Sequence, residues 1–202
     1  LLAVAVLIGS AVHLLIVHGL IIIKLTLKLS PIMFFRGARD AMLVAFSTSS
    51  SSATLPVSMS VAEKNLGIRP IIASTVLPLG ATINMDGTAL YVGIVSVFAA
   101  QAFGIDLVFS DYVLIAGSTT LVSIGTAAVP GASLFLIAAV TQTIGMSPEQ
   151  TAIVIGFILP FDRPLDMLRT AVNIGGDLSV STAVANWENE FDKDIFERPI
   201  KF

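Results

Sequence analysis

The stretch FDRPLDMLRTAVNIGGDL, residues 161–178, places a line of charged and amide side chains inside a strongly apolar chain. On one helix, at about 100° per residue, these side chains fall within a stripe roughly 80° wide. They are Asp162, Asp166, Arg169, Asn173 and Asp177. A stripe of this kind in a membrane helix indicates a functional site, because ionisable groups are costly in hydrocarbon.

The composition favours a membrane protein over one with a large soluble core. Hydrophobic residues make up 55% of the chain and charged residues 12%, whereas charged residues are about 25% of an average soluble protein. Residues 1–23 contain no Asp, Glu, Lys or Arg, which is enough to cross a hydrocarbon layer of about 30 Å. The chain has no cysteine, so no disulfide framework is expected.

The distribution of charge predicts orientation and partners. Lys24, Lys28, Arg36 and Arg39 follow the first apolar run, so this end is expected to be cytoplasmic. A net charge of −3 argues against a nucleic-acid partner. Residues 187–202 are rich in acids and are expected to form a soluble C-terminal tail. The chain begins with Leu and lacks the features of a signal peptide, so we expect the C-terminal part of a longer protein.

Two segments interrupt the apolar runs with small polar residues and proline. They are SSATLP at 51–56 and SIGTAAVPGAS at 123–133. The charge-free run 112–148 would measure about 55 Å as one helix, too long for a single crossing. A re-entrant hairpin, buried in protein or facing a cavity, satisfies that length. For the first segment, a plain loop outside the membrane is the alternative.

The order of segments suggests an internal repeat. Each interruption precedes an apolar segment that carries an acid: Asp86 in NMDGT (84–88) after the first, and the polar stripe after the second. Secondary transporters are often built from such repeats, with their sites near the bilayer midplane.

The chemistry of these acids leaves alternatives open. Gly87 weakens its helix, so nearby carbonyls, Asn84 and Asp86 offer oxygen ligands to a hard cation, and a monovalent ion suits such a site. The alternative is a kinked helix with one satisfied Asp. Asp166 and Arg169 either form an internal ion pair or bind a ligand that carries both an amine and a carboxylate.

Four motifs carry a resemblance to a known family: SSSSATLP (49–56), LPLGATINMDGTALY (77–91), SIGTAAVPGA (123–132) and DMLRTAVNIGGD (166–177). The chain resembles the C-terminal half of the dicarboxylate/amino acid:cation symporters, which include the excitatory amino acid transporters. The resemblance implies an all-α membrane protein whose transmembrane helices are joined by two re-entrant helical hairpins and a broken helix. It implies a sixth transmembrane helix and connection at 1–40, hairpins at 41–65 and 110–145, a broken seventh helix at 70–105 and an eighth helix at 150–186. The N-terminal scaffold helices of the family are expected to be missing from this sequence.

The resemblance also implies a set of binding residues. The substrate would be held by Asp166 at its amino group, by Arg169 at its side-chain carboxylate, and by residues around its α-carboxylate and at the hairpin tips. The full substrate set is Ser50, Ser51, Thr88, Val129, Pro130, Asp166, Arg169, Thr170 and Asn173. Sodium would be held by Gly80, Asn84, Asn173 and Asp177 at one site, by Thr82, Ser123, Ile124 and Thr126 at a second, and by Asn84 and Asp86 at an incomplete third.

The implied function is sodium-coupled uptake of aspartate or glutamate by an elevator-like alternating-access movement. The protein would be no enzyme, use no cofactor beyond sodium ions, and form a multi-pass homotrimer in the lipid bilayer of the plasma (cell inner) membrane. The alternatives are a proton- or sodium-coupled dicarboxylate transporter, an ion channel, and an intramembrane aspartyl protease with Asp86 and Asp177 as its dyad. Ser49 occupies a position that is Arg in some archaeal members, and we hypothesise that Arg163 supplies that guanidinium. Asp162 has no assigned role.

Overall fold

The computed structural model describes residues 1–198, which form helices and contain one isolated β-bridge but no β-strand. This confirms the all-α prediction for the described part of the chain. The helices are α1 (Leu2–Val12), η1 (His13–Thr26), α2 (Pro31–Thr48), α3 (Ser51–Lys64), α4 (Pro70–Ile83), α5 (Asp86–Ala102), α6 (Phe109–Ser123), α7 (Ser133–Thr143), α8 (Pro148–Trp187) and α9 (Lys193–Glu197).

Serine caps begin three of these helices. The Oγ atoms of Ser30, Ser50 and Ser147 accept hydrogen bonds from backbone N–H groups in the first turns of α2, α3 and α8. Such caps satisfy donors that have no partner inside the helix. Pro31 and Pro148 follow two of the caps, where the missing N–H costs nothing.

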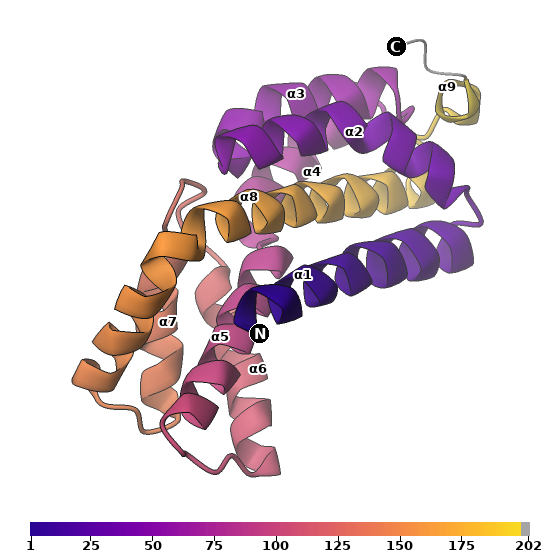
Figure 1. Cartoon of the computed structure of the whole chain (residues 1–202). Coiled ribbons are helices and arrows are strands. Elements are labelled where there is room, and N and C mark those ends of the chain that lie inside the picture. Colours follow the sequence, from indigo (N-terminus) through magenta and orange to yellow (C-terminus); the bar gives the residue numbers. More distant parts are fainter. Residues whose placement is uncertain (199–202) are drawn as a thin grey trace.

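The helices divide into two groups that share α8 (Figure 1). One hydrophobic core joins α2, α3 and α4 to the C-terminal half of α8, through residues such as Phe34, Leu66, Leu77 and Leu178. The other joins α5, α6 and α7 to the N-terminal half, through residues such as Val95, Ile137 and Ile158. The middle of α8 therefore lies where the two cores meet.

The long helix α8 bends between its two halves, as Figure 1 shows. Pro160 and Pro164 lie inside it. Each proline removes a backbone hydrogen bond and its ring crowds the preceding turn, which is the usual cause of a bend.

Each group of helices contains a helical pair with an irregular joint. Helices α2 and α3 meet at Ser49 and Ser50, and α6 and α7 are joined by residues 124–132. A third irregularity, Asn84 and Met85, separates α4 from α5. The first pair begins at Pro31, where Ser30 caps the helix, and the predicted bounds 41–65 of the first hairpin stay a prediction. That these pairs re-enter a membrane stays a prediction.

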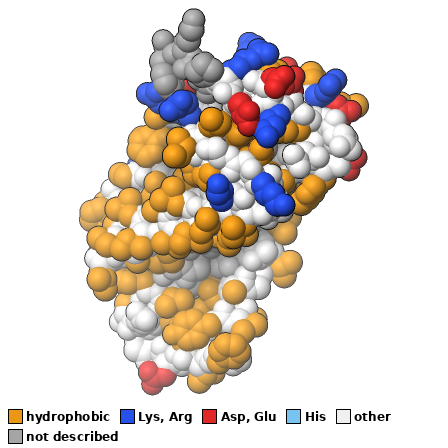
Figure 2. All heavy atoms as spheres, turned by 90° about the vertical axis from the view of Figure 1, so that its right-hand side faces the viewer, with side chains coloured by type: hydrophobic (Ala, Val, Ile, Leu, Met, Phe, Trp, Pro, Cys, Tyr) orange, Lys and Arg blue, Asp and Glu red, His pale blue; other side chains and the backbone are white. Residues whose placement is uncertain are grey.

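The surface is apolar over wide areas. Residues 2–26 and 70–102 are the two helical stretches among the described residues that are long and apolar enough to cross a membrane. Large side chains such as Leu7, Ile8, Leu15 and Ile16 are exposed on α1 and η1. Figure 2 shows hydrophobic side chains over the middle of one face and most charged side chains at one end. This is the pattern expected of a surface that contacts lipid.

The C-terminal segment contacts the rest of the protein through Phe191, Asp192 and Phe196. Phe196 of α9 is buried, Phe191 forms an antiparallel bridge with Ile68, and the Asp192 N–H donates to the Gly67 carbonyl oxygen. Part of the predicted soluble tail at 187–202 therefore contacts the rest of the protein, through residues 191–196. Residues 199–202 lie outside the described part of the chain.

Substitution of Gly67 tests this docking. Gly67 has φ +70°, and a Cβ atom would overlap the Asp192 carbonyl. Gly104 has φ +68° with no atom near the same position, so Gly104→Ala carries only the backbone strain. We expect Gly67→Ala to lower the free energy of unfolding by about 1–3 kcal/mol more than Gly104→Ala, as measured by thermal unfolding in detergent. Equal losses would contradict the described packing.

Candidate functional site

A small polar cavity lies where the three irregular joints meet the middle of α8. Its volume is about 20 Å³, which is enough for roughly one water molecule. Its walls come from the α2–α3 joint, the start of α5, the α6–α7 connection and α8. The lining residues are Ser49, Ser51, Met85, Thr88, Thr126, Ala127, Ala128, Val129, Ala132, Ser133, Asp166, Arg169, Thr170 and Asn173.

The central charge of the site is Arg169, whose side chain is 2% exposed. Its Nη2 lies 2.9 Å and its Nε 3.1 Å from Asp166 Oδ1, and its Nη1 lies 3.3 Å from Asp162 Oδ1. The guanidinium carbon sits 4.4 Å from the centre of the Tyr91 ring. A buried cation is tolerated only with such compensation, so Arg169 is held in place by two carboxylates and an aromatic face.

Asp162 acquires a role that sequence reasoning did not assign. It is buried, it pairs with Arg169, and it accepts a hydrogen bond of 2.9 Å from the Tyr91 hydroxyl. The sequence places Asp162 in the polar stripe, one helical turn before Asp166. Its role could not be predicted because its partner Tyr91 belongs to α5, which is distant in sequence.

Asn173 connects α8 to the start of α5. Its Oδ1 accepts hydrogen bonds from the N–H groups of Gly87 (2.8 Å) and Thr88 (3.3 Å), and its Nδ2 donates to the Thr88 hydroxyl (3.2 Å). Asn173 therefore caps a helix to which it does not belong. The approach requires glycine, because a Cβ at residue 87 would lie 2.5 Å from the Arg169 carbonyl oxygen.

The hairpin tips touch each other and α8. Ser50 Oγ donates to the Ala128 carbonyl oxygen at 2.7 Å, and the Gly131 N–H donates to Asp166 Oδ2 at 2.9 Å. Ser50 therefore joins the tips and does not line the cavity. Pro130 is exposed and does not line it either. The other predicted substrate residues, from Ser51 to Asn173, all line it.

Two serines that are not in the predicted substrate set also line the cavity. The hydroxyls of Ser49 and Ser133 are buried, line the cavity and have no hydrogen-bond partner in the described structure. A buried polar atom without a partner is costly, so these hydroxyls are suited to meet a polar ligand. Arg163 is exposed and is not among the lining residues, so the structure does not support the hypothesis that it replaces a guanidinium at position 49.

The residues expected to bind sodium form two neighbouring groups. In one, the Asn84 side-chain amide donates to Asp177 Oδ1 at 2.9 Å, and Gly80 packs so closely that a Cβ would lie 2.5 Å from the same oxygen. In the other, the Thr82 carbonyl accepts a hydrogen bond from Gly125, while the Ser123 carbonyl accepts one from Thr126. Ile124 lies between them and is exposed.

Asp86 is held by two histidines that sequence reasoning overlooked. Its Oδ2 lies 2.9 Å from His13 Nε2 and 2.6 Å from His18 Nε2. The expected sodium partner Asn84 instead bonds to Asp177. The third predicted cation site thus has a different set of neighbours from the one expected.

Comparison with known proteins places this geometry in context. A family model described as the sodium:dicarboxylate symporter family matches residues 1–187. The chain is 38% identical over 195 residues to an excitatory amino acid transporter of Caenorhabditis elegans, covering 96% of this chain and 38% of that protein. It is 40% identical to excitatory amino acid transporter 5 of Mus musculus (90% and 33% covered) and to excitatory amino acid transporter 1 of Rattus norvegicus (86% and 31%). The chain spans about a third of the length of these relatives.

The role of Asp162 in holding Arg169 can be tested by truncation. Asp162→Ala leaves the buried guanidinium with one carboxylate and removes the acceptor of the Tyr91 hydroxyl. Since a hydrogen bond to a charged group contributes about 2 kcal/mol, we expect the free energy of unfolding to fall by about that amount. Asp106→Ala, which changes an exposed Asp, serves as the control in the same thermal unfolding experiment. A loss no greater than that of the control would show that Asp162 does not support Arg169.

Proposed function

Because the chain belongs to the sodium:dicarboxylate symporter family, we propose that it forms the substrate- and ion-binding part of a symporter that couples sodium entry to uptake of aspartate or glutamate. The family consists of membrane transporters and not of enzymes, so the aspartyl protease alternative is set aside. The relatives' names refer to excitatory amino acid transport, which supports an acidic amino acid as substrate.

The observation that carries the proposal is the buried Arg169 beside Asp166 at the cavity wall. A guanidinium presents its N–H donors in a fork that matches a carboxylate. Asp166 contributes a carboxylate suited to an ammonium group, at about one helical turn from the Arg. A substrate with a carboxylate and an amine would replace part of the internal ion pair by equivalent bonds, which limits the cost of desolvating both charges.

The remaining polar groups of the cavity fit the same kind of ligand. Ser49 and Ser133 supply hydroxyls without partners, while Asn173 and Thr170 line the same cavity as Arg169. A ligand with two carboxylates and one amine offers acceptors and donors to all of them. A dicarboxylate without an amine would leave Asp166 facing an anion, which makes it the second candidate.

Sodium coupling would act through the break between α4 and α5. Asp177 and Asn84 lie on one side of this break, and Asn173 caps α5 on the other. One turn of α8 therefore separates a group suited to sodium from a group suited to substrate. A cation that orders Asn84 and Asp177 would fix the position of Asn173, so the two ligands would bind cooperatively.

Access to the cavity requires movement, because about 20 Å³ is far too small for an amino acid. The α6–α7 connection covers the site through bonds from Gly131 to Asp166 and from Ser50 to Ala128. We propose that this connection opens to admit substrate, and that the closed unit then moves across the bilayer in an elevator-like step. The homotrimeric assembly and the plasma (cell inner) membrane location are parts of the same proposal.

Uptake into liposomes tests the proposal directly. The purified natural full-length protein is reconstituted, and labelled aspartate, glutamate and succinate are offered with an inward sodium gradient, a proton gradient or neither. Uptake of an acidic amino acid that depends on sodium is expected. Uptake of succinate alone would favour the dicarboxylate alternative, and uptake driven by protons alone would contradict sodium coupling.

Removal of the guanidinium should abolish recognition of the acidic side chain. We expect Arg169→Ala to reduce uptake of labelled aspartate and glutamate to the level of empty liposomes, because the carboxylate loses its cationic partner. Arg163→Ala is the matched control, since it removes an exposed Arg from the same helix and should leave uptake unchanged. Retained aspartate affinity in Arg169→Ala would refute the assignment.

Neutralising Asp177 should weaken sodium binding more than substrate binding. Asp177→Asn keeps the side-chain shape but replaces a charged oxygen with a neutral one. We expect the sodium concentration for half-maximal uptake to rise roughly tenfold or more, because a charged ligand is worth more than a neutral one, while aspartate affinity at saturating sodium changes little. The measurement is sodium titration of uptake, with Asp106→Asn as control. A lower substrate affinity with an unchanged sodium requirement would assign Asp177 to the substrate instead.

A further inference from the structure

Three metal-ligating side chains converge at the start of α5, outside the substrate cavity. They are His13 and His18 of η1 and Asp86 of α5, and their ligand atoms all lie within 4.8 Å of one another. The two imidazole rings meet edge to face with their centres 4.9 Å apart. We propose that these three residues bind a divalent transition-metal ion, for which Zn²⁺ is the best match.

The helix type explains how the two histidines reach one carboxylate. In an α-helix, residues five apart point about 140° away from each other. Residues 13–26 instead form a π-helix, whose hydrogen bonds join residues five apart. His13 and His18 thus lie one turn apart on the same side of the helix, and the Nε2 atom of each contacts Asp86.

The donor set fits zinc in type and in geometry. Zn²⁺ binds imidazole nitrogen and carboxylate oxygen at about 2.0–2.2 Å, which places tetrahedral ligands about 3.3 Å apart. The nitrogens of His13 and His18 now lie 2.9 and 2.6 Å from Asp86 Oδ2. An ion would therefore lengthen these two nitrogen–oxygen separations by less than 1 Å, while the three ligand atoms, all within 4.8 Å of one another, would move to a common separation of about 3.3 Å.

The surroundings already orient two of the ligands. His18 Nδ1 lies 2.7 Å from the Ser179 hydroxyl, and that hydroxyl donates to the Gly176 carbonyl oxygen at 2.9 Å. Asp86 Oδ1 accepts a hydrogen bond of 2.8 Å from the Gly87 N–H. Metal-binding histidines almost always make such a second bond, which fixes the ring and its tautomer.

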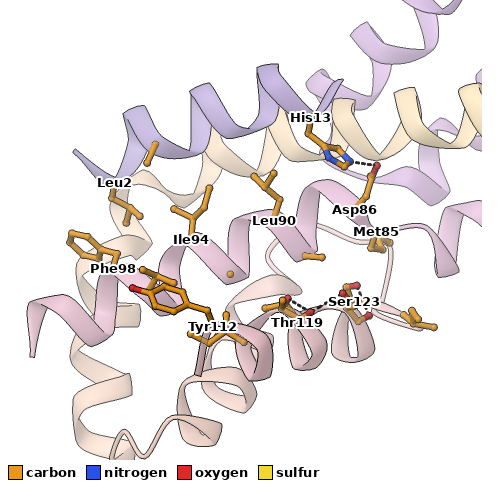
Figure 3. A pocket seen from close by; sticks show the side chains of 18 of the residues that line it. Leu2, His13, Met85, Asp86, Leu90, Ile94, Phe98, Tyr112, Thr119 and Ser123 are labelled. Atoms are coloured by element: carbon orange, nitrogen blue, oxygen red, sulfur yellow. Dashed lines mark hydrogen bonds and ion pairs between the residues drawn. The ribbon is translucent and has the colours of Figure 1, made fainter. Parts of the chain in front are cut away.

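One side of the cluster is open. His13 and Asp86 line a cavity of about 770 Å³ between α1, α5 and α6, and Figure 3 shows both side chains at one end of it. The side chain of His18 is only 5% exposed, whereas those of Asp86 and His13 are 18% and 24% exposed. The ion would enter from the cavity, and a water molecule there would supply its fourth ligand, as in open zinc sites.

Occupation would have a consequence that rests on the proposed function. Asp86 is also the carboxylate of the third expected sodium site, so Zn²⁺ and Na⁺ would compete for it. A zinc ion would also tie η1 to the first turn of α5, beside the helix break that sodium is proposed to order. Zinc is therefore expected to inhibit uptake, and high sodium to relieve the inhibition.

Direct binding tests the site without any transport measurement. Zn²⁺ is titrated into the metal-free purified full-length protein in competition with a fluorescent chelator. We expect one strong site per chain, weakened at least 100-fold in His18→Gln, which retains a donor to Asp86, and about tenfold in Ser179→Ala. Asp106→Asn should bind as the unchanged protein does. Equal affinity in His18→Gln and the unchanged protein, or no binding at all, would overturn the proposal and show a metal-free His–Asp cluster.

A second histidine variant and a measurement of uptake complete the test of the zinc site. If His18→Gln fails to fold, as judged by its thermal unfolding, His13→Gln takes its place, with the same loss of zinc binding expected. Zinc inhibition of sodium-dependent uptake that disappears in the histidine variant supports competition at Asp86, and inhibition that persists there overturns it. Absence of sodium-dependent uptake together with intact zinc binding would refute the proposed function alone.

Discussion

The structure depends on hydrogen-bond partners for the backbone N–H groups at helix ends, because several of these ends lie inside an apolar protein. An unpartnered N–H away from water is costly, and α5 begins at such a place. Asn173 accepts bonds from two of its first N–H groups, and Asp166 accepts one from Gly131 in the α6–α7 connection. The polar stripe on α8 thus supplies both the chemistry of the site and the hydrogen bonds that allow irregular backbone to exist there.

Sequence reasoning succeeded where the signal was local. The two small-residue interruptions lie at helix ends in the structure, and the spacing of Asp166, Arg169 and Asn173 placed them on one face. It failed where partners are distant in sequence. Tyr91 reaches Asp162 from another helix, Ser50 bonds to a second tip instead of the cavity, and Phe196 is buried in a segment whose acidic composition predicts a soluble tail.

The two hydrophobic cores share few elements, and α8 is the element whose polar stripe lies between them. Its residues pack into one core before the bend and into the other after it. Arg169 and Asn173 occupy the junction, close to α5 and to both joints. A displacement of either core relative to the other would therefore alter the polar contacts of α8 first. The hydrogen bonds and ion pairs of the site therefore depend on the relative positions of the helices around it.

The π-helix at 13–26 bears on how such chains are interpreted. In a π-helix each hydrogen-bonded turn contains one more residue than in an α-helix, so the spacing of residues that share a face is different. His13 and His18 look unrelated at 3.6 residues per turn, yet they meet at one carboxylate. Histidines four apart would have reached the same target from an ordinary helix. Wider helical turns thus let two side chains five residues apart reach one partner, which an ordinary helix would not allow.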